Sequence, residues 1–308
     1  MASTDESKTK FIYNNGFNNT FQTEALPNSL PLHQNNPLYT PHNLYAEQIS
    51  GTVFTTPRHL NKRTWMCRCL PSCASTNKCE KCKDYFGNDE SYYDPNPIRW
   101  FPQTSYETSF IHSIKKYVTS DTNPSTKNGL SIYLYAFQNT SQDECMINSD
   151  GDFLIVPQKG TLIIQTELGM LEVSPCEIIV IPRGIVFSTS CDSKANGYIL
   201  EIYKGHFELP ELGPIGANGL ANARDFLYPT AHFSQDKTHT MHNKYANALC
   251  NKQSHAPFNV VSWHGNYSPY KYNLNHFNTM SSVSYDHPDP SIYIVLTAKS
   301  NEDGTAIR

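Results

Sequence analysis

The sequence contains no long hydrophobic run. Among its 308 residues, no stretch approaches the roughly 18 consecutive apolar residues of a membrane-spanning helix. Near the N-terminus, the charges of Asp5, Glu6, Lys8 and Lys10 interrupt any apolar core of a secretory signal. We therefore expect no membrane partner and place the protein in the cytoplasm.

An excess of positive charge is missing as well. The chain has 24 Lys and Arg residues against 28 Asp and Glu residues, which gives a formal net charge of -4 at pH 7. Proteins that bind nucleic acid need clustered Lys and Arg to neutralise the phosphates. A nucleic-acid partner is therefore not expected.

Cysteine is not scarce, but its number is odd. Nine Cys residues and no secretory signal predict free thiols in a reducing compartment. Five of them lie close together: Cys67, Cys69, Cys73, Cys79 and Cys82. Four thiolates at such spacing can hold a structural Zn²⁺. An insert with ordinary reduced thiols is the alternative.

Aromatic and turn-forming residues are abundant. The 19 Tyr, 15 Phe, 20 Pro and 15 Gly favour strands joined by turns over long helices. From residue 130 onward, short apolar or alternating runs follow one another closely, which predicts a β-sandwich or β-barrel. The runs are LSIYLYAF (130–137), DFLIVP (152–157), TLIIQT (161–166), EIIVIP (177–182), IVFSTS (185–190) and GYILEIY (197–203), with FNVVSW (258–263) and SIYIVLTA (291–298) further along.

The chain divides into four segments. We assign 1–66 to an extended N-terminal arm and first strands, 67–128 to a Cys-rich insert and a short helix, 129–278 to the β domain, and 279–308 to the beginning of a second β domain. The arm is rich in Pro, which opposes helix and central strand. Its many apolar side chains indicate that it lies on its own domain or on a neighbouring subunit.

A short amphipathic helix is predicted within 106–118. In this stretch, five apolar residues recur at helical spacing and would share one face. They are Phe110, Ile111, Ile114, Tyr117 and Val118.

The segment 148–189 resembles a cupin, a jelly-roll β-barrel. A strand leads to a turn at Gly160, and a second strand leads to the Pro182-Arg183-Gly184 turn. At the places where metal-binding cupins carry their ligands, this chain has Ile147, Ser149, Phe153 and Phe187 or their immediate neighbours, and none of these is a His. A divalent metal needs imidazole or carboxylate donors that converge on one point. We therefore expect a cupin-like scaffold without metal ligands of its own.

Longer strings resemble the homogentisate 1,2-dioxygenase family and follow that family's order. The similarity extends from about residue 16 to the end and weakens in 66–110 and 232–256. The strings are NLYAEQISGTVFTTPR (43–58), NKRTW (61–65), NSDGDFLIVPQKG (148–160), HFELPELGPIGANGLANARDFL (206–227), PFNVVSWHGNYSPYKYNL (257–274) and DHPDPSIYIVLTAKS (286–300).

The resemblance implies a chemistry. Enzymes of this family open the aromatic ring of homogentisate with O2 and give maleylacetoacetate, a step in tyrosine and phenylalanine breakdown. They use Fe(II) held by two His and one carboxylate, with positions left open for substrate and O2. A homo-oligomer is expected.

The resemblance also implies one catalytic residue, His287, which would accept a proton from the phenolic hydroxyl. A turn His without a catalytic role is the alternative. The family's iron ligands would follow Arg308, so this chain is expected to bind no iron and to be inactive alone. We interpret it as a truncated member of the family. A catalytically inactive paralogue that binds partners or joins oligomers is the competing hypothesis.

The remaining candidates are expected to be structural. His206 and His264 are interpreted as hydrogen-bonded residues of the scaffold. His239 and His242, in THTMHNK, have loose metal-like spacing but are assigned to a solvated turn. The glycines of GPIGANG lack the strand and the Lys-bearing helix of a phosphate loop.

Overall fold

The computed structural model describes residues 10–31, 40–74, 80–81, 105–138, 143–211, 219–235, 237–279, 294–299 and 306–307. This part of the chain is mainly β, as predicted. None of its helices is long and apolar enough to cross a membrane. The helices are α1 (Phe110–Ser113) and the 3-10 turns Pro41–Asn43, Ser72–Ala74, Ala223–Asp225 and Leu274–His276.

The largest sheet has eight antiparallel strands in the order β1-β16-β20-β12-β9-β14-β7-β6. Its central strands are the apolar runs that the sequence predicts, since buried strands favour such residues. The strands are β1 (Tyr13–Asn15), β16 (Phe226–Pro229), β20 (Tyr270–Asn273), β12 (Glu177–Ile181), β9 (Asp152–Lys159), β14 (Ala195–Ile202), β7 (Asn128–Phe137) and β6 (Lys115–Asn123).

A second sheet has seven strands in the order β11-β10-β13-β8-β17-β18-β5. Only β17 and β8 pair in parallel; the other neighbours are antiparallel. The strands are β11 (Gly169–Val173), β10 (Leu162–Thr166), β13 (Val186–Cys191), β8 (Glu144–Asn148), β17 (Thr238–Tyr245), β18 (Ala248–His255) and β5 (Glu80–Lys81).

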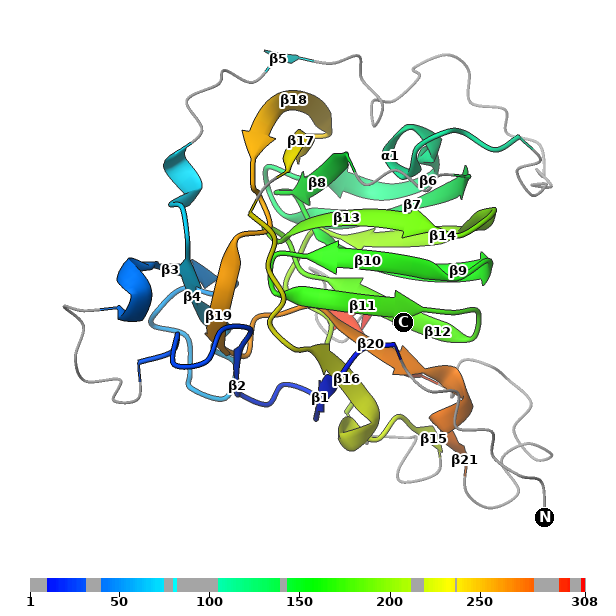
Figure 1. Cartoon of the computed structure of the whole chain (residues 1–308). Coiled ribbons are helices and arrows are strands. Elements are labelled where there is room, and N and C mark those ends of the chain that lie inside the picture. Colours follow the sequence, from blue (N-terminus) through cyan, green and yellow to red (C-terminus); the bar gives the residue numbers. More distant parts are fainter. Residues whose placement is uncertain are drawn as a thin grey trace, which may run out of the picture.

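A smaller third sheet lies beside these two, in the order β2-β19-β4-β3 (Figure 1). It joins N-terminal strands to a strand from residues 260–265. Its strands are β2 (Phe21–Glu24), β19 (Val260–Gly265), β4 (Arg63–Arg68) and β3 (Tyr45–Ser50). Two short pairs complete the described strands: β15 (Gly219–Leu220) with β21 (Asn278–Thr279), and β22 (Ala298–Lys299) with β23 (Ala306–Ile307).

The two large sheets share one aromatic core. Phe153 on β9 and Phe187 on β13 are both fully buried, and their ring centroids lie 6.4 Å apart in an edge-to-face arrangement. Phe110 of α1 packs its ring against Phe187 from the side. The fold is therefore a cupin-like β-sandwich. At positions where metal-binding cupins hold ligands, it packs aromatic rings, which stabilise the core by burial and by ring contacts.

Two turns that the sequence predicts have the expected backbone. Gly160 has φ of 80°, and a Cβ there would lie 2.4 Å from the carbonyl oxygen of Lys194. Gly184, in the turn after Pro182, has φ of 82°. Both values lie in the left-handed region that favours glycine.

The predicted helix is shorter than its pattern indicates. Only Phe110–Ser113 is helical, and β6 begins at Lys115, so Tyr117 and Val118 belong to a strand. Phe110, Ile111 and Ile114 are nevertheless buried, as the helical spacing predicts. Pairing of β6 with β7 overrides the local preference after the first turn.

The N-terminal arm lies on the sheets of its own chain. β1 pairs with β16, and β2 pairs with β19. The eight-stranded sheet thus takes strands from three of the four predicted segments, because β1 comes from 1–66 and β6 from 67–128. The segment boundaries themselves stay a prediction.

The expectation of free thiols is met at six cysteines and is wrong for one. Cys250 on β18 is disulfide-bonded. The six free thiols are those of Cys67, Cys69, Cys73, Cys145, Cys176 and Cys191.

A buried ionic cluster connects the two large sheets. The Lys244 ammonium on β17 lies 2.7 Å from Asp150 Oδ2 and 2.9 Å from Glu201 Oε1 on β14. All three side chains are at most 3% exposed. Glu201 Oε2 accepts hydrogen bonds from the hydroxyls of Tyr133 and Tyr203 at 2.6 and 2.8 Å. Charges this deep are tolerated because they are paired and hydrogen-bonded.

Replacement of Lys244 by Met tests this cluster. The variant leaves two buried carboxylates without their cation, so we expect it to lose about 3–5 kcal/mol of unfolding free energy. Lys159→Met, at the exposed end of β9, is the matched control and should stay within about 0.5 kcal/mol of the wild type. Chemical denaturation measures both. A Lys244→Met chain as stable as the control would contradict the role given to this cluster.

Candidate functional site

The predicted catalytic residue His287 lies outside the described residues, as do Cys79 and Cys82. Its role therefore stays a prediction. Three of the five clustered cysteines are described. Cys67 is buried with Leu44 and Val261, and Cys69 packs against the same group, while Cys73 is exposed. The zinc prediction depends on all five positions and also stays open.

The environment of Cys67 favours the protonated thiol over the thiolate that a metal ion would need. Burial raises its pKa above the usual 9.0, and this effect exceeds the lowering by the nearby hydroxyl of Ser262. A buried thiol of this kind is unreactive, whereas a metal-bound one must be deprotonated.

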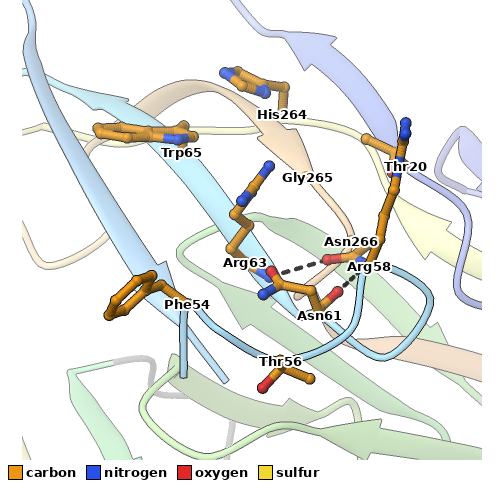
Figure 2. Close-up of a pocket in the computed structure, with 10 residues that line it drawn as sticks. All are labelled: Thr20, Phe54, Thr56, Arg58, Asn61, Arg63, Trp65, His264, Gly265 and Asn266. Atoms are coloured by element: carbon orange, nitrogen blue, oxygen red, sulfur yellow. Dashed lines mark hydrogen bonds between the residues drawn. The ribbon is translucent and has the colours of Figure 1, made fainter. Parts of the chain in front are cut away.

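A surface pocket of about 580 Å³ lies on the third sheet and on the loop that joins β3 to β4 (Figure 2). Its described lining residues include two guanidinium groups and no Asp or Glu, so the pocket can attract an anionic group. The backbone N–H of Arg63 donates to Asn266 Oδ1 at 3.0 Å, and the side chain of Asn266 donates to the carbonyl of Asn61 at 2.8 Å. Its lining is Thr20, Phe54, Thr56, Arg58, Asn61, Arg63, Trp65, His264, Gly265 and Asn266.

His264 lines this pocket and makes no side-chain hydrogen bond to a described residue. The expectation that it is a hydrogen-bonded scaffold residue is therefore not met. Burial and the nearby charge of Arg63 lower its pKa below 6.5, which favours the neutral imidazole near pH 7.

His206, by contrast, is a hydrogen-bonded scaffold residue, as expected. Its Nδ1 lies 2.7 Å from Asp152 Oδ2, and its Nε2 lies 2.8 Å from the carbonyl oxygen of Gly51. Both ring nitrogens thus face oxygen atoms that can accept hydrogen bonds. The guanidinium of Arg183 reaches Asp152 Oδ1 at 2.8 Å. Burial would raise the pKa of Asp152, but His206 and Arg183 outweigh it and hold that pKa at about 2.

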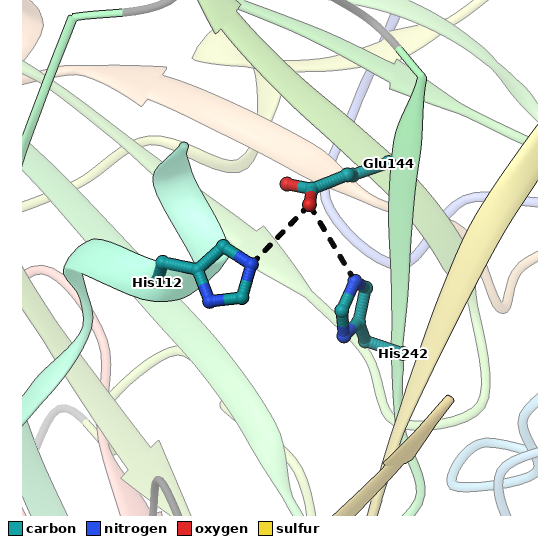
Figure 3. Close-up of side chains that lie close together, drawn as sticks. All are labelled: His112, Glu144 and His242. Carbon is teal, nitrogen blue, oxygen red and sulfur yellow. Dashed lines mark ion pairs between the residues drawn. The ribbon is translucent and has the colours of Figure 1, made fainter. Parts of the chain in front are cut away.

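One group of metal-ligand side chains converges in the described part of the chain: His112, Glu144 and His242 (Figure 3). They come from α1, from the start of β8 and from β17. Glu144 Oε1 lies 3.3 Å from His112 Nε2 and 3.8 Å from His242 Nε2. One potential ligand atom of each residue lies within 4.8 Å of the other two.

The local fold explains why these side chains meet. β17 runs parallel to β8, with His242 opposite Met146, two residues from Glu144 on the same face of the strand. Ser109 occupies the N-cap position of α1, yet its hydroxyl donates to Glu144 Oε2 and does not cap the helix. The helix, and His112 with it, is thereby held over the two strands.

The electrostatics of Glu144 favour the carboxylate. His242 lowers its pKa most, and Ser109 and His112 contribute, so the pKa is about 2 despite burial. The separation of 3.8 Å between His242 and Glu144 is too long for a hydrogen bond, so we attribute the effect of His242 to its proximity.

The prediction of a solvated turn at 239–242 is wrong. Both His239 and His242 lie on strand β17 and are 2% and 3% exposed. Neither ring nitrogen of His242 has a hydrogen-bond partner in the part of the chain that the structure describes. A buried polar group without a partner costs about 1–3 kcal/mol.

Sequence reasoning missed His112 and Glu144 altogether. These two residues and His242 are separated by 32 and 98 positions along the chain (112 to 144, and 144 to 242). The one signal of this group in the sequence is the His-x2-His spacing of His239 and His242. That spacing suggests that these two histidines act together, but on the strand they do not. His239 instead places its ring against Phe258, with centroids 5.1 Å apart.

Comparison with known proteins decides the family. The family model described as homogentisate 1,2-dioxygenase N-terminal matches residues 12–274, and the C-terminal model of the same family matches residues 275–308. The chain belongs to the homogentisate 1,2-dioxygenase family. The homogentisate 1,2-dioxygenase of Emericella nidulans is 48% identical over 310 residues, which cover 97% of this chain and 69% of that protein. The human enzyme of the same name is 47% identical over 308 residues. This alignment covers 96% of this chain and 69% of the human protein.

Solved structures are similar to parts of this homogentisate 1,2-dioxygenase family member. A cupin domain from Bordetella pertussis has 13% identity and a TM-score of 0.24, and the match covers 33% of this chain and 100% of that domain. The match is too partial to support the fold by itself. The strand order and the shared aromatic core support the cupin-like fold instead.

The pair of Asp152 and His206 makes stability depend on pH. The pKa of Asp152 is about 2 in the folded protein against 3.8 in its ordinary state, so its stabilisation is present above pH 3.8 and is lost as pH falls through 2. The shift corresponds to about 2 kcal/mol. We expect the stability gap between the wild type and Asp152→Asn to shrink by about that amount between pH 5 and pH 2.

Urea denaturation at several pH values measures this gap. Asp143→Asn is a suitable control, because the Asp143 side chain is 66% exposed. Its gap to the wild type should stay small throughout. A gap for Asp152→Asn that does not change with pH would rule out the paired carboxylate as its source.

Proposed function

We propose that this protein acts in the cleavage of homogentisate by O2, which yields maleylacetoacetate. The observation that supports this most is the identity of 46–48% to homogentisate 1,2-dioxygenases from a fungus, a mammal and an amoeba over 96–97% of the chain. Similarity at this level extends through both family models, and not only through the scaffold domain.

The reaction in this family uses Fe(II), and one described group of side chains offers donors for a metal ion. The donors of His112, Glu144 and His242 are of the right kind, two imidazoles and one carboxylate. A ring-cleaving iron, however, needs room for an aromatic acid beside it. The described cavity that includes Glu144 has a volume of about 10 Å³. Small-molecule sites have roughly 300–1,000 Å³. These residues therefore do not fit the catalytic iron.

We infer that the catalytic iron binds outside the described residues. The family resemblance assigns its ligands to positions after Arg308. What the described residues supply in this proposal is the scaffold: two large sheets that are joined by packed aromatic rings and by the Lys244 cluster. Homo-oligomerisation and the cytoplasmic location remain predictions from the sequence.

His287 is proposed as the proton acceptor for the phenolic hydroxyl of homogentisate. An imidazole titrates near neutral pH, so it can take up a proton and release it in each cycle. The sequence SYDHPDPS places Asp286 and Asp289 near it along the chain. A carboxylate in contact with the ring would favour the protonated form after transfer.

A first experiment concerns turnover. We expect an iron-loaded chain that extends to the full length of the relatives to consume O2 with homogentisate, and the 308-residue chain to consume none. O2 uptake and bound iron per chain are measured for both. Turnover by the 308-residue chain would contradict the placement of the iron ligands. A full-length chain without turnover would favour the binding paralogue.

A second experiment concerns His287. In the full-length chain, His287→Gln should lower kcat by roughly 10²–10⁴-fold, the usual contribution of a positioned general base. Iron content should not change. His276→Gln, at an exposed residue of a 3-10 turn, is the control and should retain its rate. If both variants had the same kcat, His287 would be a turn residue without a catalytic role.

A further inference from the structure

We propose that His112, Glu144 and His242 form a structural zinc site that fastens helix α1 to the seven-stranded sheet. These side chains are the described His/Cys/Asp/Glu group with metal-ligand spacing (Figure 3). Two imidazoles and one carboxylate are ligands that Zn²⁺ accepts, and water can take the fourth position.

The separations between ligand atoms are close to those of a tetrahedral site. Bond lengths of about 2.0–2.1 Å to zinc place two tetrahedral ligands about 3.3 Å apart. Glu144 Oε1 and His112 Nε2 are 3.3 Å apart, and Glu144 Oε1 and His242 Nε2 are 3.8 Å apart. A movement of about half an ångström at His242, within the reach of a side-chain rotation, would bring its Nε2 to the same distance from Glu144 Oε1. The ligand atoms of His112 and His242 lie within 4.8 Å of each other.

Glu144 is oriented for a bond through one oxygen. Its Oε2 accepts the hydroxyl of Ser109, which leaves Oε1 directed at the two imidazoles. Hydrogen bonds of this kind from residues behind the ligands fix their orientation in metal sites. The hydroxyl would cap α1 in an ordinary helix, so its use on Glu144 indicates that the position of this carboxylate is specified.

His242 provides the independent observation. Its side chain is 4% exposed and points at Glu144, and neither of its ring nitrogens has a hydrogen-bond partner among the described residues. Buried polar groups in folded proteins are almost always satisfied by protein, water or an ion. The two imidazole rings stand nearly perpendicular, with an interplanar angle of 87° and centroids 5.7 Å apart. In this arrangement both can direct a nitrogen lone pair toward one point beside Glu144.

The role that the surroundings allow is structural. The cavity at Glu144 has about 10 Å³, which leaves no place for a substrate. The three ligands come from α1, β8 and β17, and an ion among them would connect elements distant in sequence. α1 has only four residues and makes one turn, so it gains little stability from its own backbone. A bound metal ion would hold this short helix in place against the sheet.

Zinc binding is the direct test. The 308-residue chain is treated with chelator, mixed with ZnCl2 and passed through gel filtration, and bound zinc is measured by elemental analysis. We expect one equivalent that is lost in His242→Leu and in His112→Ala. Zinc should raise the Tm of the wild type by about 5 °C at 100-fold excess over Kd and leave the Tm of His242→Leu unchanged. Because His242 has no hydrogen bond to any described residue that the substitution would remove, this variant is expected to fold.

Two control variants distinguish zinc bound by His112, Glu144 and His242 from zinc bound elsewhere in the chain. His239→Gln changes the neighbouring buried His of the same strand and should keep the equivalent. Cys79→Ser tests the predicted cysteine site and should also keep it. Substitution with Co²⁺ distinguishes the two sites by spectrum, because thiolate ligands give charge-transfer bands and a His/Glu/His site gives none.

Several results would overturn the proposal. These are a wild-type chain that retains no zinc, equal retention by wild type and His242→Leu, or loss of the equivalent in Cys79→Ser alone. The first would mean that the three residues form only an ion pair. None of these outcomes depends on homogentisate turnover, so the proposed function is tested separately.

Discussion

Two β-sheets in this protein meet around a buried ammonium group. Lys244 reaches Asp150 and Glu201 at hydrogen-bond distance, and no atom of its side chain is exposed. Asp150 also accepts the backbone N–H groups of Ala246 and Asn247, so the turn after β17 is fixed by the same carboxylate. β17 in turn pairs with β8, and this pairing brings His242 to Glu144. The position of the candidate metal site therefore depends on the ionic cluster.

Local sequence patterns predicted the centre of the fold well. Runs such as 152–157 and 177–182 are strands β9 and β12, because alternation and β-branched residues express strand preference directly. The glycine turns at 160 and 184 follow from backbone sterics and were equally visible. Family membership was evident from long strings in order.

What the sequence could not predict is set by contacts between distant residues. THTMHNK is polar enough to suggest a turn, yet its Lys and His are buried because the partners lie on β8 and β14. The apolar spacing in 106–118 is helical throughout, but the residues from Lys115 onward form strand β6, because they pair with β7. No local signal relates residue 112 to residues 144 and 242. Such a group can be recognised only once the strands are placed.

The order of strands in the eight-stranded sheet has a consequence for synthesis. β1, the first of the described strands, contacts the sheet through β16, and β16 contacts it through β20, which ends at Asn273. β1 therefore has no partner in this sheet until the residues of β16, such as Pro229 opposite Tyr13, have left the ribosome. Sheets built from such distant pairings fold slowly and leave strand edges open meanwhile. Among the described strands, β1 is thus one of the last to reach its place, and its unpaired backbone is open to chaperones in the interval.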